Sequence, residues 1–337
     1  MHHLMSSPRS LVLFIVASAL LAPASAQEAP ALAKHKRWVT SLAFNGDGSQ
    51  LATAGGESLQ YRPGEVVLWD AKSGAELAKL TGHPTNIWSV AWSADGSLLL
   101  TSGYDGKVIL WDVAAKQPKT TIEKKGWVRS VAFAPDGKHF AAGMEDGNIV
   151  IWETEGAKEA KTIKAHEAAV YGLAFSPDGA TLASVSTDKL GKLFDWQAGS
   201  EKAKLEGHGD AVWSVAWSKD GSLLATSSAD RKIKLWDAEG KEQATLEGHK
   251  DWVSDVAFNH DGSQLASVSH DRTAKLWDVK ERKELATLPQ QNSTLWAVAF
   301  FPDGSLLATG AHDGVKLWKV ADKTEVFPTP PMTAAAK

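Results

Sequence analysis

The sequence predicts an all-β fold built from seven similar units that follow one another along the chain. The clearest unit runs from Gly248 to Asp278 and contains three short runs of alternating polar and apolar residues, at 252–258, 264–269 and 273–278. Each run is rich in β-branched or aromatic side chains, and an Asp-Gly turn at Asp261 joins the first two, which is typical of antiparallel strands. Three strands cannot bury their apolar faces alone, so repetition at a fixed period indicates sheets that pack against one another in series.

Three repeated sequence features give the number of units. The Asp-Gly turn recurs at Asp47, Asp95, Asp136, Asp178, Asp220, Asp261 and Asp303. The aromatic residue near the end of the third run recurs every 41 or 42 residues, at Trp69, Trp111, Trp152, Phe194, Trp236, Trp277 and Trp318. An alanine followed by an aromatic residue ends the first run, with the aromatic at Phe44, Trp92, Phe133, Phe175, Trp217, Phe258 and Phe300. All three markers give seven units.

A Gly-His pair follows several of the units, and its spacing resembles that of a known family. His249, for example, stands 28 residues before Trp277. This pattern resembles the tryptophan-aspartate (WD) repeat β-propellers over residues 29 to 327. The resemblance implies a seven-bladed β-propeller of four-stranded antiparallel blades, and it says little about function.

The resemblance also implies a hydrogen-bonded tetrad in each blade, made of a His, a Ser or Thr of the second strand, an Asp and a Trp. Two sets match in full, namely His208, Ser228, Asp230 and Trp236, and His249, Ser269, Asp271 and Trp277. The second blade keeps His83, Asp105 and Trp111, and the motif decays in the remaining blades. We expect these residues to be structural, because the tetrad pairs polar groups that burial would otherwise leave unsatisfied.

The chain divides into three parts. Residues 1–26 are predicted to be a signal peptide, 27–327 the propeller and 328–337 a disordered tail. The blade cores are expected at about 36–81, 86–123, 127–164, 169–206, 211–247, 252–289 and 294–319. The last blade is expected to be closed by an N-terminal strand at 28–34, in which Leu32 occupies a repeated apolar position. The alternative closing segment is 324–327.

The N-terminus predicts export to the periplasm or the exterior. Arg9 precedes an apolar run of 11 residues from Leu11 to Leu21, which is too short to span a membrane, and Ala24-Ser25-Ala26 is typical of a cleavage site. An uncleaved N-terminal anchor is the alternative. The chain contains no cysteine, which excludes disulfides, thiolate metal sites and a lipid-anchored lipoprotein.

Composition excludes two classes of partner. Without the signal the chain has 35 basic and 40 acidic residues, a formal charge of −5. Nucleic acid is therefore not expected as a partner, because such binding requires neutralised phosphates. A polybasic membrane patch is excluded on the same ground.

Aromatic residues gather where the first strand of each blade begins. Six positions before the strand's terminal aromatic stand Trp38, Trp127 and Trp252, and four before it stand Trp88, Tyr171, Trp213 and Trp296, with Arg129 in the third blade. Positions two apart on a strand point the same way, so we expect both sets to line one ring at the top of the central channel. The residue before the tetrad Asp adds Tyr104, His270 and His312 to this ring, and six extra residues in the first blade place Tyr61 and Arg62 in a top-face loop. The alternative is that the aromatics pack between blades.

The ring predicts a non-catalytic interaction platform in the cell envelope that binds a protein or peptide partner by aromatic stacking. A glycan is the alternative ligand, and a propeller enzyme with a site at the top of the channel or a domain separated from a larger partner are further alternatives. No Gly-x-Ser-x-Gly motif or phosphate loop is present, and His270 and His312 lack a third ligand in phase, so no metal or other cofactor is expected. The protein is expected to be a monomer.

The signal peptide makes one direct prediction. The intact mass of the protein purified from its native source should correspond to a chain that begins at Gln27, because cleavage follows Ala26. Full-length protein recovered from the cytoplasm would contradict export.

Overall fold

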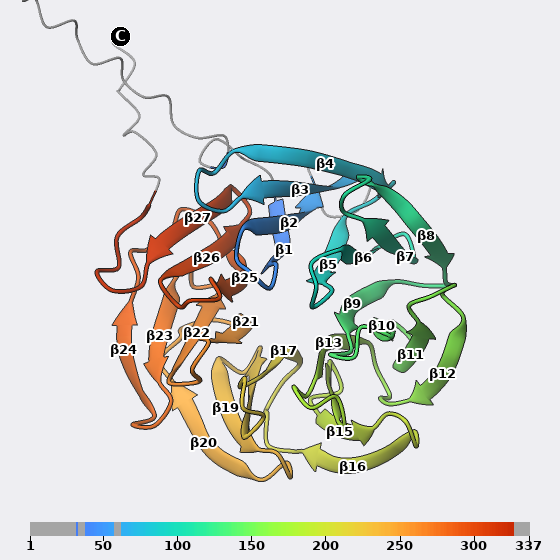
Figure 1. Cartoon of the computed structure of the whole chain (residues 1–337). Coiled ribbons are helices and arrows are strands. Elements are labelled where there is room, and N and C mark those ends of the chain that lie inside the picture. The colour runs from blue at the N-terminus through green and yellow to red at the C-terminus, as the bar shows by residue number, and fades with distance from the viewer. Residues whose placement is uncertain (1–31, 33–37, 57–61, 327–337) are drawn as a thin grey trace, which may run out of the picture.

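The computed structural model describes residues 32, 38–56 and 62–326, and their secondary structure consists of 27 strands. The strands form seven antiparallel sheets arranged as blades in a ring (Figure 1). Six sheets have four strands in sequence order, and the seventh has three strands and an isolated bridge. The predicted seven-bladed all-β propeller is therefore confirmed.

The strands of the first four blades are β1 (Trp38–Phe44), β2 (Gln50–Gly56), β3 (Gly64–Asp70), β4 (Glu76–His83), β5 (Ile87–Trp92), β6 (Leu98–Gly103), β7 (Lys107–Asp112), β8 (Gln117–Glu123), β9 (Val128–Phe133), β10 (His139–Met144), β11 (Asn148–Glu153), β12 (Glu159–Lys164), β13 (Val170–Phe175), β14 (Leu182–Ser186), β15 (Gly191–Asp195) and β16 (Ser200–Leu205). Those of the last three are β17 (Val212–Trp217), β18 (Leu223–Ser228), β19 (Lys232–Asp237), β20 (Glu242–Glu247), β21 (Val253–Phe258), β22 (Gln264–Ser269), β23 (Ala274–Asp278), β24 (Lys283–Thr287), β25 (Leu295–Phe300), β26 (Leu306–Ala311) and β27 (Gly314–Lys319).

The Asp-Gly turns join the first and second strands of every blade. In all seven turns the glycine has a positive φ, for example 73° at Gly262, a conformation that side chains with a Cβ rarely adopt. In each turn a carboxylate oxygen of the Asp also accepts the amide two residues further on, as between Asp261 and Ser263 at 2.9 Å. The turns predicted from the sequence are thus present in all seven blades.

Each blade completes the core of its neighbour. The cluster around Trp111, for example, combines Val66 and Leu68 of the first blade with Ile109 and Trp111 of the second. The second and third strands are almost wholly buried, whereas the outermost strands expose one face. The innermost strands contact one another around the ring, and β1 packs against β25 to complete the circle.

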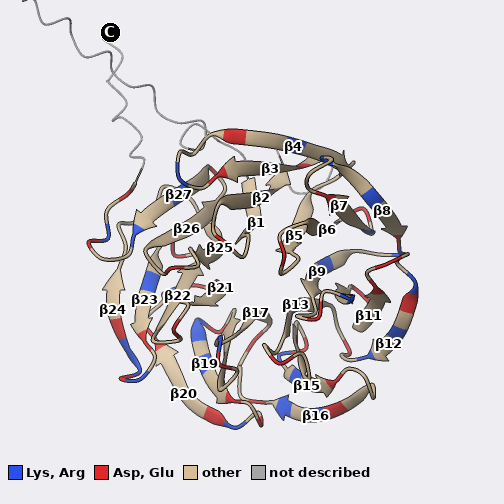
Figure 2. Ribbon diagram, in the orientation of Figure 1, with Lys and Arg blue, Asp and Glu red and all other residues tan. Residues whose placement is uncertain are grey.

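Charged residues are concentrated on the outer strands and in the loops (Figure 2). Among the 43 residues of the seven innermost strands, only Arg129 in β9 and Asp255 in β21 carry a charge. Buried charges are costly unless they are paired, so two isolated charges in this position point to a local function.

The described part of the last blade shows pairing by the alternative segment, while the predicted closing strand at 28–34 stays a prediction. Within the described residues the outer edge of β27 pairs with the segment that follows it, which was the alternative: Trp318 bridges Glu325, and the Val326 amide donates to the carbonyl of Leu317 at 2.8 Å. This local hairpin closes a shorter loop than pairing with the N-terminus would, and a shorter loop loses less chain entropy.

Leu32 nevertheless lies in the predicted place. It is buried among Val315, Leu317 and Trp69, at the junction between the last blade and the first. Its amide donates to the carbonyl of Gly74 at 3.0 Å rather than to β27. The other residues of the expected closing strand at 28–34, the signal peptide and the tail lie outside the described residues.

Candidate functional site

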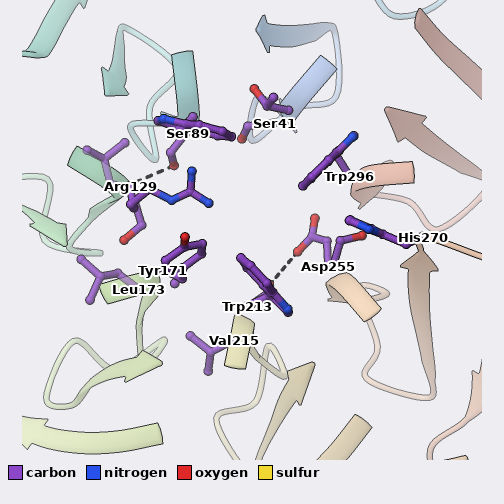
Figure 3. A pocket seen from close by; sticks show the side chains of 17 residues that line it. Ser41, Ser89, Arg129, Tyr171, Leu173, Trp213, Val215, Asp255, His270 and Trp296 are labelled. Carbon is purple, nitrogen blue, oxygen red and sulfur yellow. Dashed lines mark hydrogen bonds between the residues drawn. The ribbon is translucent and has the colours of Figure 1, made fainter. Parts of the chain in front are cut away.

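A bulge in each innermost strand creates the candidate site. The pairing register of these strands skips one residue, so that Val39 and Ser41 of β1, for example, face adjacent residues of β2. The skipped residues are Thr40, Trp88, Arg129, Tyr171, Trp213, Ser254 and Trp296, one in each blade. A bulge leaves the extra residue unpaired and re-aims its side chain. All seven line the central channel, where Figure 3 shows Arg129, Tyr171, Trp213 and Trp296.

The bulge also corrects the prediction that the two aromatic sets form one layer. Strict alternation fails where an extra residue is inserted, so Trp38, Trp127 and Trp252 do not line the channel cavity with the bulge residues. They lie instead against the residues that precede the tetrad aspartates. Trp38 stacks on His312 with ring centroids 3.9 Å apart, and Trp127 stacks on Tyr104 at 4.5 Å.

Trp38, Trp127 and Trp252, with the rings that they stack on, form an aromatic rim. Ring contacts join this rim to the residues that line the channel. Trp252 lies 5.1 Å from His270 and 5.6 Å from Trp213, and His270 lies 4.6 Å from Trp296. Trp296 in turn stacks on His312 at 5.5 Å. The structure therefore brings most of the predicted ring residues into one continuous aromatic surface. Trp252 is 43% exposed, which places it at the open edge of this surface.

Arg129 lies between two aromatic rings inside the channel. Its guanidinium carbon is 3.8 Å from the ring centroid of Trp88 and 3.9 Å from that of Tyr171. It makes no ion pair or hydrogen bond within the described residues, and its Nε is buried without an acceptor. Burial lowers the pKa of Arg129 to about 10, so the side chain is still protonated at neutral pH.

Asp255 faces the same cavity from the sixth blade (Figure 3). Its carboxylate accepts hydrogen bonds from the Ser214 hydroxyl at 2.6 Å and from the amides of Val256 and Val298 at 2.9 Å. Burial raises the pKa of Asp255 to about 6, and the three donors only partly offset this effect. The carboxylate thus links three successive blades and makes no ion pair with Arg129.

Asp255 could have been singled out from the sequence by comparing the residue that follows the bulge in each blade. The positions of the aromatic residues alone do not identify it. The repeat position directly after the bulge reads Ser41, Ser89, Ser130, Gly172, Ser214, Asp255 and Ala297. Two of these hydroxyls accept an amide of the next blade, Ser41 from Val90 at 3.1 Å and Ser89 from Val131 at 3.2 Å. Asp255 makes the same bond to Val298, and it is the one carboxylate in a set of small residues.

The cavity at the channel mouth has a volume of about 170 Å³. An apolar cavity of about 150 Å³ accommodates one benzene molecule, so this space suits a single side chain or a small head group. Trp88, Trp213 and Trp296 border it, and the indole N–H of each is buried without an acceptor in the described residues.

Four of the predicted site residues have different outcomes. Arg62 is exposed in the loop before β3, and Tyr61 lies outside the described residues. His270 and His312 are separated by the ring of Trp296, and burial lowers the pKa of both imidazoles. In the part of the chain that the structure describes, no three His, Asp or Glu side chains are grouped as metal ligands.

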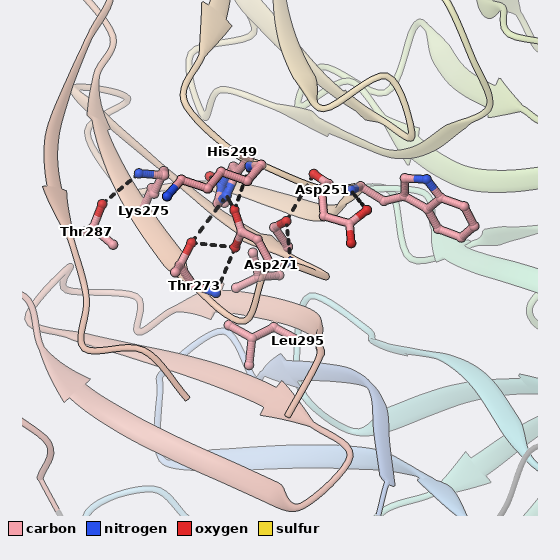
Figure 4. Close-up of polar contacts among 12 residues, drawn as sticks. His249, Asp251, Asp271, Thr273, Lys275, Thr287 and Leu295 are labelled. Atoms are coloured by element: carbon pink, nitrogen blue, oxygen red, sulfur yellow. Dashed lines mark hydrogen bonds and ion pairs between the residues drawn. The ribbon is translucent and has the colours of Figure 1, made fainter. Parts of the chain in front are cut away.

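The tetrads are present, but the structure corrects the hydroxyl in two of them. In the fifth blade His208 Nδ1 bonds Asp230 at 2.9 Å, and its Nε2 bonds the hydroxyl of Thr226 at 2.8 Å rather than that of Ser228. The indole N–H of Trp236 donates to the same Thr226 oxygen at 2.9 Å. In the sixth blade Ser267 instead of Ser269 bonds His249 Nε2 and accepts from the indole N–H of Trp277. Figure 4 shows His249 bonded to Asp271 in this blade.

The physical reason is the proximity of Ser228 and Ser269 to the turn. Each stands two residues before the tetrad Asp, where its hydroxyl accepts the amide of that Asp and donates to a carbonyl of the preceding loop. Thr226 and Ser267 stand two positions earlier on the same face of the strand. They reach the indole N–H groups of Trp236 and Trp277. In the second blade His83, Asp105 and Trp111 are joined in the same way through Thr101, a residue that the repeat motif alone did not identify.

Comparison with known proteins agrees with this architecture. The family described as "WD domain, G-beta repeat" matches residues 29–70, 240–278 and 282–319, and the one described as "Echinoderm microtubule-associated protein second beta-propeller" matches residues 87–255, just over half of the chain. A seven-bladed propeller with these repeats defines the class, and the chain belongs to the WD-repeat β-propellers.

Curated relatives match over shorter stretches. WD repeat-containing protein 1 of Xenopus tropicalis is 38% identical over 27% of this chain and 14% of its own length. Eukaryotic translation initiation factor 3 subunit I of Scheffersomyces stipitis is 32% identical over 32% of this chain and 29% of its own length. A subunit of chromatin assembly factor 1 from Mus musculus is 28% identical over 33% of this chain and 22% of its own length. The match thus spans less than a third of each of these relatives.

The described secondary structure includes no candidate for a helical membrane span. Over residues 32, 38–56 and 62–326 there is no helix with the length and apolar character that crossing a bilayer requires.

The corrected tetrad makes a prediction about stability. Thr226→Val should lower the free energy of unfolding by about 2 to 3 kcal/mol, because it leaves the buried indole N–H of Trp236 and a ring nitrogen of His208 unpaired. Ser228→Ala should cost about 1 kcal/mol, since it removes one turn bond. Urea unfolding of both variants measures the difference. A larger loss for Ser228→Ala would restore the original assignment.

Asp255 makes a prediction about pH. Its pKa in the folded protein is above the usual 3.8, so the folded state binds the proton more tightly and the unfolding free energy falls as pH rises from about 4 to about 6. A shift of this size corresponds to at most about 3 kcal/mol. Asp255→Asn should remove this loss, and the variant should gain stability relative to the parent protein over that interval.

The difference in unfolding free energy between the two proteins is the quantity to measure, because burial also lowers the pKa of His270 and of His312 in both. Urea unfolding at pH 4, 5, 6 and 7 supplies it. Parallel stability curves for the parent protein and Asp255→Asn would show that the carboxylate has no raised pKa.

Proposed function

We propose that this protein is a non-catalytic interaction platform that binds a protein or peptide partner at the aromatic mouth of its channel. The single observation that carries this proposal is the continuous surface formed by Trp38, His312, Trp296, His270, Trp252 and Trp213. Binding energy at protein interfaces is concentrated in Trp, Tyr and Arg residues near the centre of the contact. The mouth of the channel offers all three types, since Tyr171 lies against Trp213 and Arg129 stacks on Tyr171.

The geometry favours recognition of an extended segment. Trp252 lies exposed at the edge, whereas the cavity inside the ring has room for about one side chain. A segment that crosses the face can stack on the edge and insert one residue. Two of the relatives also carry names that mark them as subunits of larger assemblies, which supports a protein partner.

Four of the described histidines are held in structural bonds and do not suit a catalytic role. His83, His166, His208 and His249 use both ring nitrogens in bonds within their blades. Those nitrogens are therefore occupied, and a general base requires one that can reach a substrate. We further propose that the platform works in the cell envelope, which the signal-like N-terminus supports.

Trp252 provides the test of this function. A pull-down from envelope extract and arrays of peptides and glycans identify ligands, and Trp252→Ala should then weaken binding of a peptide ligand by about 1 to 3 kcal/mol, since the exposed ring contributes contact area. Its melting temperature should stay within a few degrees of the parent value, because the side chain is largely exposed. Binding is measured by calorimetry.

Leu285 supplies the matched control. It is 44% exposed on the outer strand β24, away from the channel, so Leu285→Ala should leave both melting and affinity unchanged. A glycan ligand in place of a peptide, or equal affinity for Trp252→Ala and Leu285→Ala, would contradict the proposed peptide platform.

A further inference from the structure

Arg129 is a cation that has no counterion among the residues that the structure describes. The seven innermost strands contain one other charge, Asp255, and its carboxylate is occupied by Ser214 and by the amides of Val256 and Val298. Arg129 therefore has only the faces of Trp88 and Tyr171 as partners within the described residues. Cation–π contacts stabilise the flat faces of a guanidinium, but they leave its N–H donors at the edge unsatisfied.

A ligand in the channel can reach the N–H donors of Arg129. Trp88 and Tyr171 hold the guanidinium from both sides, and Figure 3 shows its end pointing into the channel. Two stacking rings fix the plane of the side chain, so less side-chain entropy is lost when a ligand binds. The donors of a guanidinium form a planar fork that matches the two oxygens of a carboxylate.

We propose that Arg129 is the receptor for a carboxylate, supplied by an Asp or Glu side chain that the peptide partner inserts into the channel. This inference rests on the proposed function, because it names the chemistry of the partner's anchoring residue. The anchor fills the cavity of about 170 Å³ that Arg129 borders, while the peptide on either side of it contacts the aromatic rim.

Other ligand classes fit less well. Aromatic cages bind cations, but here the space between Trp88 and Tyr171 already holds the protein's own cation, which would repel a second one. A phosphate group would bring nearly two negative charges into a cavity that Asp255 also lines, whereas a carboxylate brings one. His270 also lines the cavity, but burial lowers its pKa, so it adds no cation at neutral pH.

The anchor can be tested with small probes. N-acetylglutamate N-methylamide carries a carboxylate only on its side chain, N-acetylglutamine N-methylamide is its neutral isostere, and N-acetylalanine carries a carboxylate only at the chain end. Each is titrated into the intact protein while the indole N–H signals are followed by NMR. The glutamate probe should bind at least about tenfold more tightly than the glutamine probe, because charge-assisted bidentate bonds are the stronger ones.

Variants of Arg129 test whether this residue causes the preference for the glutamate probe. Arg129→Met removes the charge and keeps a similar length, and it should abolish the preference for the glutamate probe. The fold should tolerate the change, since an unpaired buried charge is lost. Arg129→Lys keeps the charge without the fork and should retain only part of the preference. Leu285→Ala again serves as the control and should behave like the parent protein.

The outcomes are distinct. Equal binding of the glutamate and glutamine probes, or an unchanged preference in Arg129→Met, overturns the carboxylate receptor. Tighter binding of N-acetylalanine than of the glutamate probe overturns the side-chain source. Peptides on the array that bind without any acidic residue, and equally to Arg129→Met, overturn this inference while the proposed function stands. A preference for the glutamate probe together with a glycan as the sole macromolecular ligand supports the receptor and overturns the proposed function.

Discussion

The structure depends on burial between blades. No blade encloses its own apolar residues, because the second and third strands bury both faces and need a neighbouring sheet on each side. Each of the seven clusters for this reason draws on adjacent blades, and the one at the junction of the last blade and the first includes Leu32 from before the first strand. A ring of this kind is stable only when it is closed, so the stability of every blade is linked to that junction.

The same ring imposes a constraint at its centre. Seven innermost strands converge around one channel, and each has an extra residue in its pairing with the second strand. The extra residue turns its side chain toward the axis, while the next residue forms a bond to the neighbouring blade in several places, as Ser41, Ser89 and Asp255 do. One local irregularity thus both ties the blades together and supplies the lining of the candidate site.

The polar residues separate into two groups with different roles. The tetrads satisfy buried donors and acceptors inside the blades, and the chain from the Trp236 indole through Thr226 and His208 to Asp230 leaves none of these groups unpaired. The channel mouth, in contrast, retains an unpaired guanidinium and three unpaired indole N–H groups in the described residues. Unsatisfied polar groups reduce stability, and these four groups lie together around one cavity.

The sequence by itself determined the number of blades, the positions of the strands and the seven turns. These features depend on short-range rules, namely the alternation of apolar residues and the positive φ of glycines such as Gly262, and such rules act within one unit. It also identified Trp88, Arg129, Tyr171, Trp213 and Trp296 as a set, because they share one place in the repeat. Only the tertiary structure decided how these side chains point, which hydroxyl completes each tetrad and which segment pairs with β27. Each of those outcomes depends on the register between strands, on the depth of a side chain within the stacked blades or on the meeting of distant parts of the chain, and none of these can be derived from the period of the repeat.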